Sequence, residues 1–532
     1  MPTTPSIATL RDALTDPDTY PYQPESITLE QTHISLVALA PPWVYKIKKP
    51  VELGFLDFST PEQRAHFCEE ELRLNQRLAA DTYVDVVPIV QTPDGLRIDP
   101  PQADGPVVEH AVKMRYLSPD QFLDARIRRG DATTQDIDRV ADRLAAFYRA
   151  RASTPEVAEA GWIDALRVSF DENFAQTTEQ VGHTLSRPAY DALQYYTDRT
   201  FDHHAALFHR RRAGGWIVDG HGDLRLEHVH LTSDRVAIYD CIEFNERFRH
   251  LDVANDLAFL AMDLDRHGRP DWGRRLIHRV ADALGDDEMP RLIPFYKSYR
   301  AYVRGKVEGM RAADAEVPPD EQARSRRRAH RYFQWALRYA VAGNQPLVIV
   351  VMGRPGTGKS TQAAALARNL GWAHLSSDRI RKARAGVSMA RRADAATRER
   401  LYTDALSDAT YATLRTRAVE RGQRDQGTVL DATYSSPERR AAAREAFQDA
   451  GLPHAFIELT APDDTLQTRL AHREAEDAMG SDARAEDFDA LSARYQAPTA
   501  LEDPRHVRIS TDGSTDETTL AILKALIRLR DS

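Results

Sequence analysis

One short segment limits the fold of this chain more than any other, because its backbone is built to surround an anion. Residues 353–360 read GRPGTGKS and satisfy the pattern G-x-x-x-x-G-K-[ST] at every constrained position. An apolar, β-branched run at residues 347–352 precedes it and predicts a buried parallel strand. Residues 361–370 follow an Ala-rich helical pattern that ends at Gly371. Strand, loop and helix together predict a phosphate-binding loop that takes a nucleoside triphosphate.

The residues of this loop have separate expected roles. Glycines let the backbone amides converge on an anion, and the helix N-terminus adds the positive end of its dipole. Lys359 is expected to reach the β- and γ-phosphates, and Ser360 to ligate Mg2+. ATP is the expected nucleotide, with GTP as the alternative. The residues expected to contact the nucleotide here are Gly353, Arg354, Pro355, Gly356, Thr357, Gly358, Lys359, Ser360 and Thr361.

Length and composition set the frame for the rest of the chain. At 532 residues the chain is too long for one core, and its 42% hydrophobic and 28% charged content is that of a globular protein. The net charge of −9 argues against a general nucleic-acid coat. The two cysteines predict no disulfide framework. Without a signal peptide or an apolar run of about 18 residues, a cytoplasmic protein with no membrane contact is expected. No feature predicts an oligomeric state.

The pattern of elements changes near residue 342, where the sequence AGNQP interrupts the chain. Beyond it, short apolar strands alternate with helical stretches, which predicts a parallel α/β sheet covered on both faces. The expected strands are residues 373–376, 428–430, 455–459 and 506–509, and a terminal helix is expected at 516–530. We therefore expect one domain at residues 1–342 and a second, P-loop domain at residues 343–532, whose ligands bind at the carboxyl ends of the strands.

Charged residues follow two of these strands. Asp378 could accept the proton of an attacking hydroxyl, or it could simply cap the next helix. Arg381, three residues on, could hold an acceptor phosphate or the transition-state charge. Asp431 could order a Mg2+-bound water, or it could be another cap. Both aspartates are therefore candidates for catalysis or metal binding.

Two arginines complete this set. Arg469 and Arg473 are four residues apart, so both can point from one helix face toward the same phosphates, or they can form a solvated basic face. Together with Asp378 and Arg381 they resemble small P-loop kinases, a family that includes polynucleotide kinases, gluconate kinases and zeta-type toxins. There a strand-end Asp and Arg activate the acceptor hydroxyl, and lid arginines clamp the phosphates. The resemblance covers roughly residues 346–530 and implies phosphoryl transfer to a small molecule or nucleotide.

The first domain carries a different signature, HGDL at residues 221–224 and YDCIEF at 239–244. It resembles the aminoglycoside phosphotransferases, relatives of the protein kinases. The resemblance implies that Asp223 orients or deprotonates the acceptor hydroxyl and that Asp240 binds Mg2+. It also implies a protein-kinase-like α+β fold, with an N-lobe at about residues 25–115 and a helical C-lobe at about 116–342.

A lysine upstream of these motifs extends the resemblance. The segment VYKIK at residues 44–48 is similar to the strand whose lysine pairs with phosphates in those kinases. Lys46 is the expected lysine and Glu71 its expected ion-pair partner. Lys48 lies on the same strand face, so the assignment could be off by two residues.

One position departs from that family. His228 stands where an Asn is expected as a second metal ligand, and neutral imidazole is a poor ligand for Mg2+. His228 and Asp240 are nevertheless the metal candidates here. Alternatively, His221, His228 and His230 could form a transition-metal site with Asp223, although lone histidines in strands are usually packed or hydrogen-bonded.

The order of the two halves resembles bacterial proteins labelled bifunctional aminoglycoside phosphotransferase/ATP-binding protein. The expected function is ATP-dependent transfer of the γ-phosphate to a hydroxyl through the second domain, with the first as a second catalytic or regulatory module. His228 favours one alternative, a pseudokinase that gates a P-loop ATPase. A nucleic-acid 5′-end kinase or repair factor is the other, resting on resemblance and on a basic run at residues 324–328.

Overall fold

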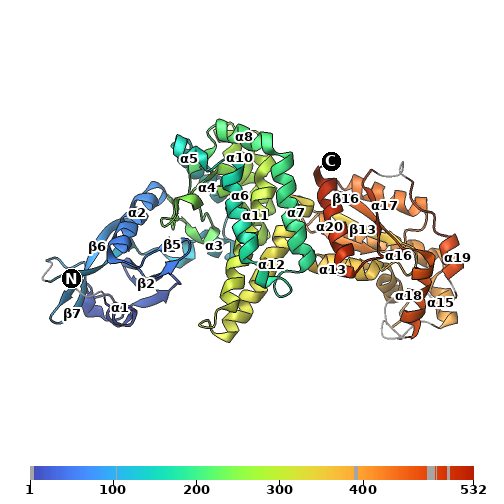
Figure 1. Cartoon of the computed structure of the whole chain (residues 1–532), viewed down its shortest axis with the longest axis horizontal. Helices are drawn as coiled ribbons and strands as arrows, with labels where there is room; N and C mark the ends of the chain where they lie inside the picture. The colour runs from blue at the N-terminus through green and yellow to red at the C-terminus, as the bar shows by residue number, and fades with distance from the viewer. Residues whose placement is uncertain are drawn as a thin grey trace. The chain divides into compact units, whose positions relative to one another are not determined.

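The structure is a computed structural model that describes residues 5–102, 105–151, 153–388, 394–475, 486, 488–499 and 504–531. The chain divides into two compact units (Figure 1). Unit 1 comprises Met1–Arg167 and Ala205–Tyr296, and unit 2 comprises Val168–His204 and Lys297–Ser532. Within the described residues, no helix is both long enough and apolar enough to cross a membrane.

Unit 1 begins with a six-stranded antiparallel sheet in the order β1-β2-β3-β8-β6-β7. Its strands are β1 (Thr28–Gln31), β2 (Ser35–Ala40), β3 (Trp43–Lys48), β6 (Tyr83–Thr92), β7 (Gly95–Ile98) and β8 (Val107–Arg115). Helices α1 (Ile7–Leu14) and α2 (Pro61–Ala79) lie on opposite sides of it (Figure 1). Because strand side chains alternate, Tyr45 and Ile47 pack with α1 residues, whereas Val44 packs with the α2 residue Cys68. Both faces of the sheet are therefore covered.

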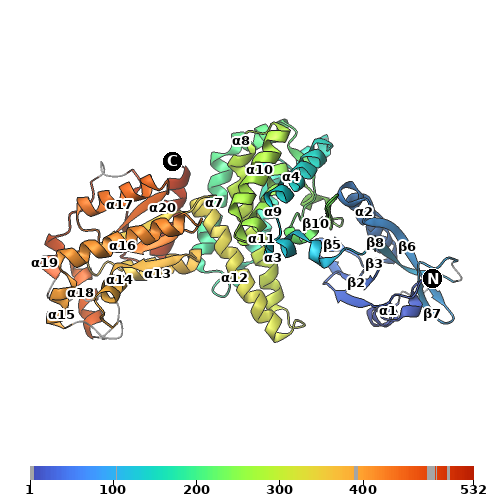
Figure 2. The same ribbon diagram turned by 180° about the vertical axis from the view of Figure 1, so that it is seen from behind.

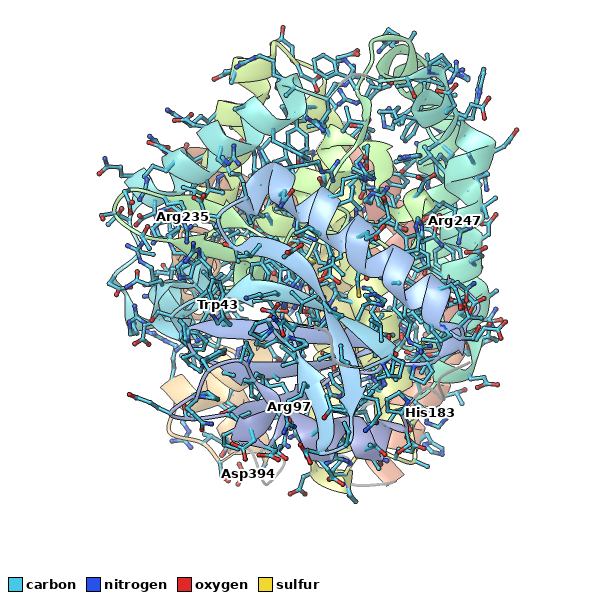
Figure 3. The ribbon with its side chains drawn as sticks, turned by 90° about the vertical axis from the view of Figure 1, so that its left-hand side faces the viewer. Trp43, Arg97, His183, Arg235, Arg247 and Asp394 are labelled. Atoms are coloured by element: carbon cyan, nitrogen blue, oxygen red, sulfur yellow. The ribbon has the colours of Figure 1, made fainter. Side chains whose placement is uncertain are left out.

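Two cations of the neighbouring strand β8 contact Trp43 of β3, which is labelled in Figure 3. Lys113 Nζ lies 4.6 Å from the centre of the indole ring, and the Arg115 guanidinium carbon lies 5.4 Å from it. Cation–π contacts of this kind stabilise by about 0.5–1 kcal/mol each where they are exposed. They supplement the backbone pairing between the two strands.

The remainder of unit 1 is mostly helical, with three short antiparallel pairs that hold its loops. The pairs are β4 (Glu52–Leu53) with β5 (Leu56–Asp57), β9 (Ile217–Asp219) with β12 (His250–Asp252), and β10 (Val229–Leu231) with β11 (Val236–Ile238). The helices are α3 (Leu123–Arg129), α4 (Thr134–Arg149), α5 (Pro155–Glu159), α8 (Ala205–Ala213), α9 (Val253–Arg266) and α10 (Pro270–Leu284). Two of the three boundaries between the units lie within helices α6 (Ile163–Gln176) and α11 (Met289–Ala313), and the third lies just before α8, between His204 and Ala205.

A buried arginine ties α8 to the start of α9. Arg211 is fully buried, and its guanidinium donates to both Asp252 carboxylate oxygens at 2.5 and 2.7 Å and to Asp286 at 2.7 and 2.8 Å. Burial alone would lower the pKa of Arg211, but the two carboxylates raise it above its usual value. Asp252 also caps α9 by accepting a hydrogen bond from the Ala254 amide at 2.8 Å. The arginine therefore fixes the helix that underlies the 221–224 loop.

Unit 2 contains a five-stranded, all-parallel sheet in the order β14-β15-β13-β16-β17. The strands are β13 (Val348–Gly353), β14 (Ala373–Ser376), β15 (Thr428–Asp431), β16 (His454–Thr460) and β17 (His506–Ser510). Helix α20 (Thr515–Asp531) follows the last strand. The predicted parallel α/β fold, its strands and its terminal helix are confirmed.

Helices bury this sheet, as its parallel pairing requires. Val350 of β13 packs in one apolar cluster with Leu414 of α16 and Phe447 of α17, while α13 and α20 contact the sheet and each other (Figure 2). The helices of this region are α13 (Lys359–Leu370), α14 (Ser377–Arg384), α15 (Ala395–Leu401), α16 (Asp404–Gly422), α17 (Pro437–Asp449), α18 (Asp463–Ala475) and α19 (Phe488–Ala493). The helices leave open the edge of the sheet at which β13, β14 and β15 end, and the segments that follow these strands lie there.

The compact units differ from the boundary expected at residues 342 and 343. Helices α7 (Arg187–His203) and α12 (Pro319–Ala342) belong to unit 2, because both pack against α20. Arg530 of α20 donates to the Tyr339 carbonyl at 2.8 Å, and Gln334 of α12 donates to the Arg368 carbonyl at 2.8 Å. The change in composition at residue 342 marks the end of a helix that is packed against the following domain.

Replacing Arg211 by Leu is expected to lower the free energy of unfolding by about 3–5 kcal/mol, because two buried carboxylates lose their partner. Arg210→Leu is the matched control, since Arg210 is 53% exposed in its pair with Glu288 and should change stability by about 1 kcal/mol or less. Urea unfolding of the full chain measures both. Equal effects of the two variants would contradict the role assigned to Arg211.

Candidate functional site

The predicted phosphate-binding loop connects β13 directly to α13. β13 ends at Gly353, and α13 begins at Lys359 with Gly358 as its N-cap. Gly353 has φ +141°, and a Cβ at this position would lie 2.4 Å from the Leu459 carbonyl oxygen of β16. Only glycine fits that approach. The N-terminus of α13 therefore begins directly after this loop, as an anion site requires.

Lys359 lies across its own loop. Its Nζ donates to the Arg354 carbonyl at 2.8 Å, and the Thr357 hydroxyl donates to the same oxygen at 2.8 Å. Arg354 points to the start of α18, where its guanidinium lies 2.6 Å from Asp463. Two side chains of the loop, Thr357 and Lys359, therefore stabilise its backbone through the same carbonyl oxygen.

Asp431 and Ser360, the two predicted Mg2+ ligands of this domain, interact. β15 pairs with β13 so that Asp431 lies opposite Val351, close to the end of β13. Burial would raise the pKa of Asp431, but the His374 and Ser360 side chains and the charge of Lys359 hold it below its usual value. His374 Nε2 lies 3.5 Å from the Asp431 carboxylate. The carboxylate therefore stays ionised beside the loop, as a metal site needs.

Asp378 and Arg381 form an ion pair at the end of the neighbouring strand. Arg381 Nη1 donates to Asp378 Oδ1 at 3.0 Å, and the guanidinium lies over the Tyr402 ring, 4.5 Å from its centre. The N-cap of α14 is Ser376, so the interpretation of Asp378 as a helix cap is wrong. Its carboxylate lies within the first turn and is oriented by Arg381.

Helix α18 lies against the phosphate-binding loop. A Cβ on Gly356 would lie 2.9 Å from the Leu466 carbonyl of this helix. Arg469 donates to the Thr511 hydroxyl at 2.9 Å and to the Thr511 carbonyl at 2.6 Å, so it is anchored beyond β17. The side chain of Arg473 lies outside the described part of the chain. The structure thus places α18 beside the loop, and the Arg469 guanidinium is hydrogen-bonded to Thr511.

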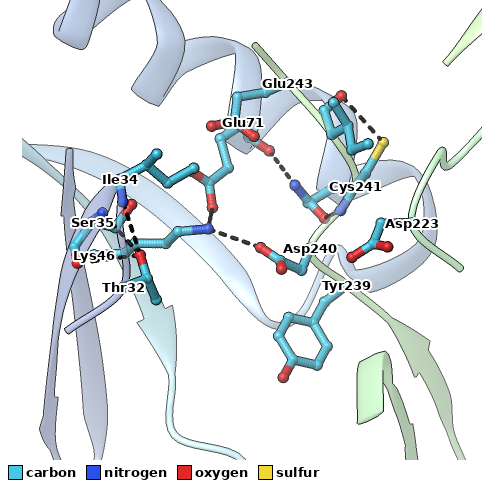
Figure 4. Close-up of polar contacts among 12 residues, drawn as sticks. Thr32, Ile34, Ser35, Lys46, Glu71, Asp223, Tyr239, Asp240, Cys241 and Glu243 are labelled. Atoms are coloured by element: carbon cyan, nitrogen blue, oxygen red, sulfur yellow. Dashed lines mark hydrogen bonds and ion pairs between the residues drawn. The ribbon is translucent and has the colours of Figure 1, made fainter. Parts of the chain in front are cut away.

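Unit 1 brings together a second set of charged residues (Figure 4). Lys46 Nζ lies 2.7 Å from Glu71 Oε1 and 2.8 Å from Asp240 Oδ1, which joins β3, α2 and the 239–244 loop. Lys48 Nζ lies 2.8 Å from the other Glu71 oxygen and also pairs with Glu243. Both lysines therefore contact Glu71, but in the described structure the contact with Asp240 belongs to Lys46.

Lys46 and Asp240 hold each other ionised. Burial would raise the pKa of Asp240, but Lys46 above all, with His228 and His221, holds it well below its usual value. Burial would lower the pKa of Lys46, yet Asp240 and Glu71 raise it. Asp240 also has a positive φ of 63°, a strained conformation for a residue other than glycine. Strain of this kind is found most often where function requires it.

The 221–224 loop is fixed from below by α9. Asp256 accepts hydrogen bonds from the amides of His221 at 2.8 Å and Gly222 at 3.0 Å, and from the Tyr148 hydroxyl at 3.0 Å. Gly222 has φ +84°, and a Cβ there would lie 2.9 Å from the Phe248 carbonyl. The backbone turn that presents Asp223 therefore depends on a buried carboxylate from another element.

Asp223, His228 and Asp240 form one cluster, in which a ligand atom from each lies within 4.8 Å of the others. The alternative three-histidine site is not formed. His221 Nε2 contacts the Tyr239 carbonyl at 3.0 Å, and its Nδ1 accepts from the Asp223 amide at 3.3 Å. His230 packs edge-on against Phe122 instead. One histidine and two aspartates remain as the metal candidates of unit 1.

Comparison with known proteins assigns the chain to a family. Uncharacterized protein Rv2004c of Mycobacterium tuberculosis is 31% identical over 484 residues, which cover 90% of this chain and 92% of the relative. Mb2027c of Mycobacterium bovis matches with the same identity and coverage. The chain belongs to the family of Rv2004c. Residues 348–498 also match the family model described as an AAA domain, so unit 2 of this family member contains a P-loop domain.

Solved structures resemble part of the chain more distantly. A gluconokinase from Sinorhizobium meliloti is 22% identical, with a TM-score of 0.27, and covers 35% of this chain and 94% of its own. The APS kinase CysC of Mycobacterium tuberculosis, in complex with AMPPNP and APS, is 21% identical, with a TM-score of 0.27, and covers 34% and 98%. The roles proposed below for this member of the Rv2004c family therefore rest on its own geometry.

Two residues of α2 support the unit 1 site without having been predicted from the sequence. Asn75 accepts from the Cys241 amide at 2.8 Å and donates to the Glu71 carbonyl at 2.9 Å. Arg77 donates to the Gly220 carbonyl at 2.8 Å and lies 3.0 Å from Asp219. The signal that could have found Asn75 is its spacing of four residues from Glu71, which places both on one helix face.

Proposed function

We propose that the chain is an ATP-dependent phosphotransferase whose P-loop domain transfers the γ-phosphate to a hydroxyl of a small molecule or nucleotide. The register of the sheet carries this proposal. Val351 of β13 lies opposite Asp431 of β15, and Asp431 lies opposite Ser376 of β14. The phosphate-binding loop, the buried carboxylate and the Asp378 turn therefore follow adjacent strands at one edge of the sheet.

Each of these residues has a role in the proposed transfer. The loop amides and Lys359 bind the β- and γ-phosphates, and Ser360 with Asp431 would hold Mg2+, which neutralises phosphate charge when it is bound. Asp378 accepts the proton of the acceptor hydroxyl, and Arg381 orients that carboxylate. Arg381 is itself 8% exposed and held over Tyr402, so it supplies a positive charge in a fixed position.

Unit 1 is proposed as a second nucleotide-binding module, of the aminoglycoside phosphotransferase-like kind. The observation that favours it is the Lys46–Glu71–Asp240 chain of ion pairs, which unites three elements far apart in sequence. Lys46 would bind nucleotide phosphates, Asp223 would orient or deprotonate an acceptor hydroxyl, and Asp240 would hold the metal ion. The module is catalytic if Asp223 supports turnover, and regulatory if it only binds nucleotide.

The nucleic-acid alternative has less support. In the basic run on α12, Arg328 lies 2.9 Å from Glu308, and Arg324 lies 3.8 Å from Glu321. Acidic neighbours therefore already balance part of its charge. Steeply salt-dependent binding of RNA or DNA would favour that alternative over a small-molecule acceptor.

Lys359→Met is expected to lower phosphoryl transfer by unit 2 roughly 100-fold or more, because a positive charge at the transferred phosphate is lost. Labelled ATP with a panel of metabolites and oligonucleotides measures transfer, and GTP is compared in the same assay. Lys524→Met is the matched control, since Lys524 lies on α20 over the Tyr195 ring. The same substitution is also made in a chain that lacks Asp223, so that unit 1 cannot account for the remaining transfer. Undiminished transfer by that double variant would contradict the proposal.

Asp378→Asn is expected to keep ATP affinity within about twofold while acceptor turnover falls roughly 100- to 10,000-fold, because the amide cannot accept the proton. Calorimetry with ATP and the transfer assay separate the two effects. Asp404→Asn, an aspartate in the first turn of α16, serves as the control. If acceptor turnover does not change, Asp378 is not the base.

Unit 1 is expected to bind a second nucleotide, so the wild-type chain should bind two. Lys46→Met should leave one, because Asp240 and the phosphates lose their cation, whereas Lys113→Met on β8 should still bind two. Calorimetric stoichiometry measures this in the full chain. A single nucleotide in the wild type, lost in Lys359→Met, would exclude unit 1 as a nucleotide-binding module.

A further inference from the structure

His228 is held in the orientation of a metal-binding histidine. It is 8% exposed, and its Nδ1 lies 2.8 Å from the Asp223 carbonyl oxygen. A carbonyl oxygen can only accept, so Nδ1 carries the proton and Nε2 of the neutral ring carries the lone pair. Histidines that bind metals almost always have the other ring nitrogen fixed by such a hydrogen bond. The backbone of Asp223 thus selects the tautomer that can bind a cation through Nε2.

The Nε2 atom faces a carboxylate without bonding to it. It lies 3.6 Å from Asp240 Oδ2, beyond the range of a hydrogen bond. The other oxygen of the same carboxylate, Oδ1, is bound by Lys46 at 2.8 Å. One carboxylate oxygen of Asp240 therefore contacts Lys46, and the other faces the imidazole of His228.

The spacing suits a shared cation. Two neighbouring ligand atoms of one first-row metal ion are roughly 3 Å apart, so the 3.6 Å between Nε2 and Oδ2 would shorten only slightly on binding. An Asp223 carboxylate oxygen lies 3.7 Å from His228 Nδ1, and one ligand atom from each of the three residues lies within 4.8 Å of the others. Rotation of the Asp223 side chain toward Nε2 would complete a set of one nitrogen and two oxygens. The set faces Lys46, where phosphate oxygens could occupy the remaining positions.

We propose that Asp223, His228 and Asp240 bind one divalent transition-metal ion, such as Mn2+, in preference to Mg2+. Mg2+ prefers oxygen ligands and sheds water reluctantly, whereas divalent first-row transition metals bind at sites that mix nitrogen and oxygen ligands. The role of the ion rests on the function proposed for unit 1, but its binding rests only on these three side chains. His228 then determines which cation unit 1 binds, and its presence in place of the expected Asn does not mean that the metal site has been lost.

The test is Mn2+ binding to tag-free, nucleotide-free full-length protein, followed by the electron paramagnetic resonance signal of free Mn2+, with Mg2+ as competitor. One tightly bound Mn2+ per chain is expected, displaced only by Mg2+ in about 100-fold or greater excess. Ser360→Ala should leave this ion in place, because the P-loop ligand is not part of the cluster. Equal affinity for Mn2+ and Mg2+ would overturn the proposal.

His228→Asn supplies the matched variant, because it replaces the nitrogen ligand by an amide oxygen. Mn2+ affinity should fall at least about tenfold while Mg2+ binds no more weakly, since even loss of a ligand's hydrogen-bond partner costs 10–100-fold. His66→Asn, an exposed histidine on α2, should change neither. Unchanged Mn2+ affinity in a folded His228→Asn variant would overturn the proposal.

A third measurement does not depend on whether His228→Asn folds. Co2+ added to the wild type should give visible absorption bands of a nitrogen-ligated site, and Asp240→Asn should lose them. A Co2+ spectrum like that of the hydrated ion would contradict the inference. Because no nucleotide is present, these results are independent of whether unit 1 binds ATP, so the inference and the proposed function can fail separately.

Discussion

The register of the five-stranded parallel sheet is the constraint on which the candidate site of unit 2 depends. It aligns the ends of β14, β15 and β13, so that residues distant in sequence meet at one edge. The apolar strands fix this register by burying their side chains on both faces. Asp431 is then buried beside Ser360 and Lys359, and it remains ionised because these groups offset the cost of burial.

Unit 1 reaches a similar balance of charge with different elements. A lysine from a strand, a glutamate from a helix and an aspartate from a loop compensate one another, and Lys48 with Glu243 extends the same network inward. Buried charges of this kind are stable only as a complete set. The strained backbone at Asp240 fits a site where position matters more than local stability. Metal selectivity at His228 would follow from the same rigid frame.

Much of this organisation was predictable from local pattern. The β-branched run, the glycines and the helix after them specify the phosphate-binding loop, and all four remaining strands of its sheet lie where the sequence predicts them. Glu71 was predicted as the partner of a lysine, but the pattern could not choose between Lys46 and Lys48, because both lie on one strand face. In the structure both lysines form ion pairs with Glu71, and Lys46 also forms one with Asp240. Asn75 and Arg77 carry no motif, because their role is only to join α2 to loops that are far away in the chain.

The sequence by itself determined the strand, glycine-rich loop and helix of the P-loop and the acidic residues that follow the strands, since these depend on neighbouring residues and on side-chain periodicity. The tertiary structure alone decided that α7 and α12 belong with the P-loop domain, because they pack on α20 across a long separation in sequence. It also decided the orientation of His228, which is set by a single hydrogen bond to the Asp223 carbonyl. Local pattern specifies what a segment can form, whereas burial of charge and packing between distant segments specify which atoms meet.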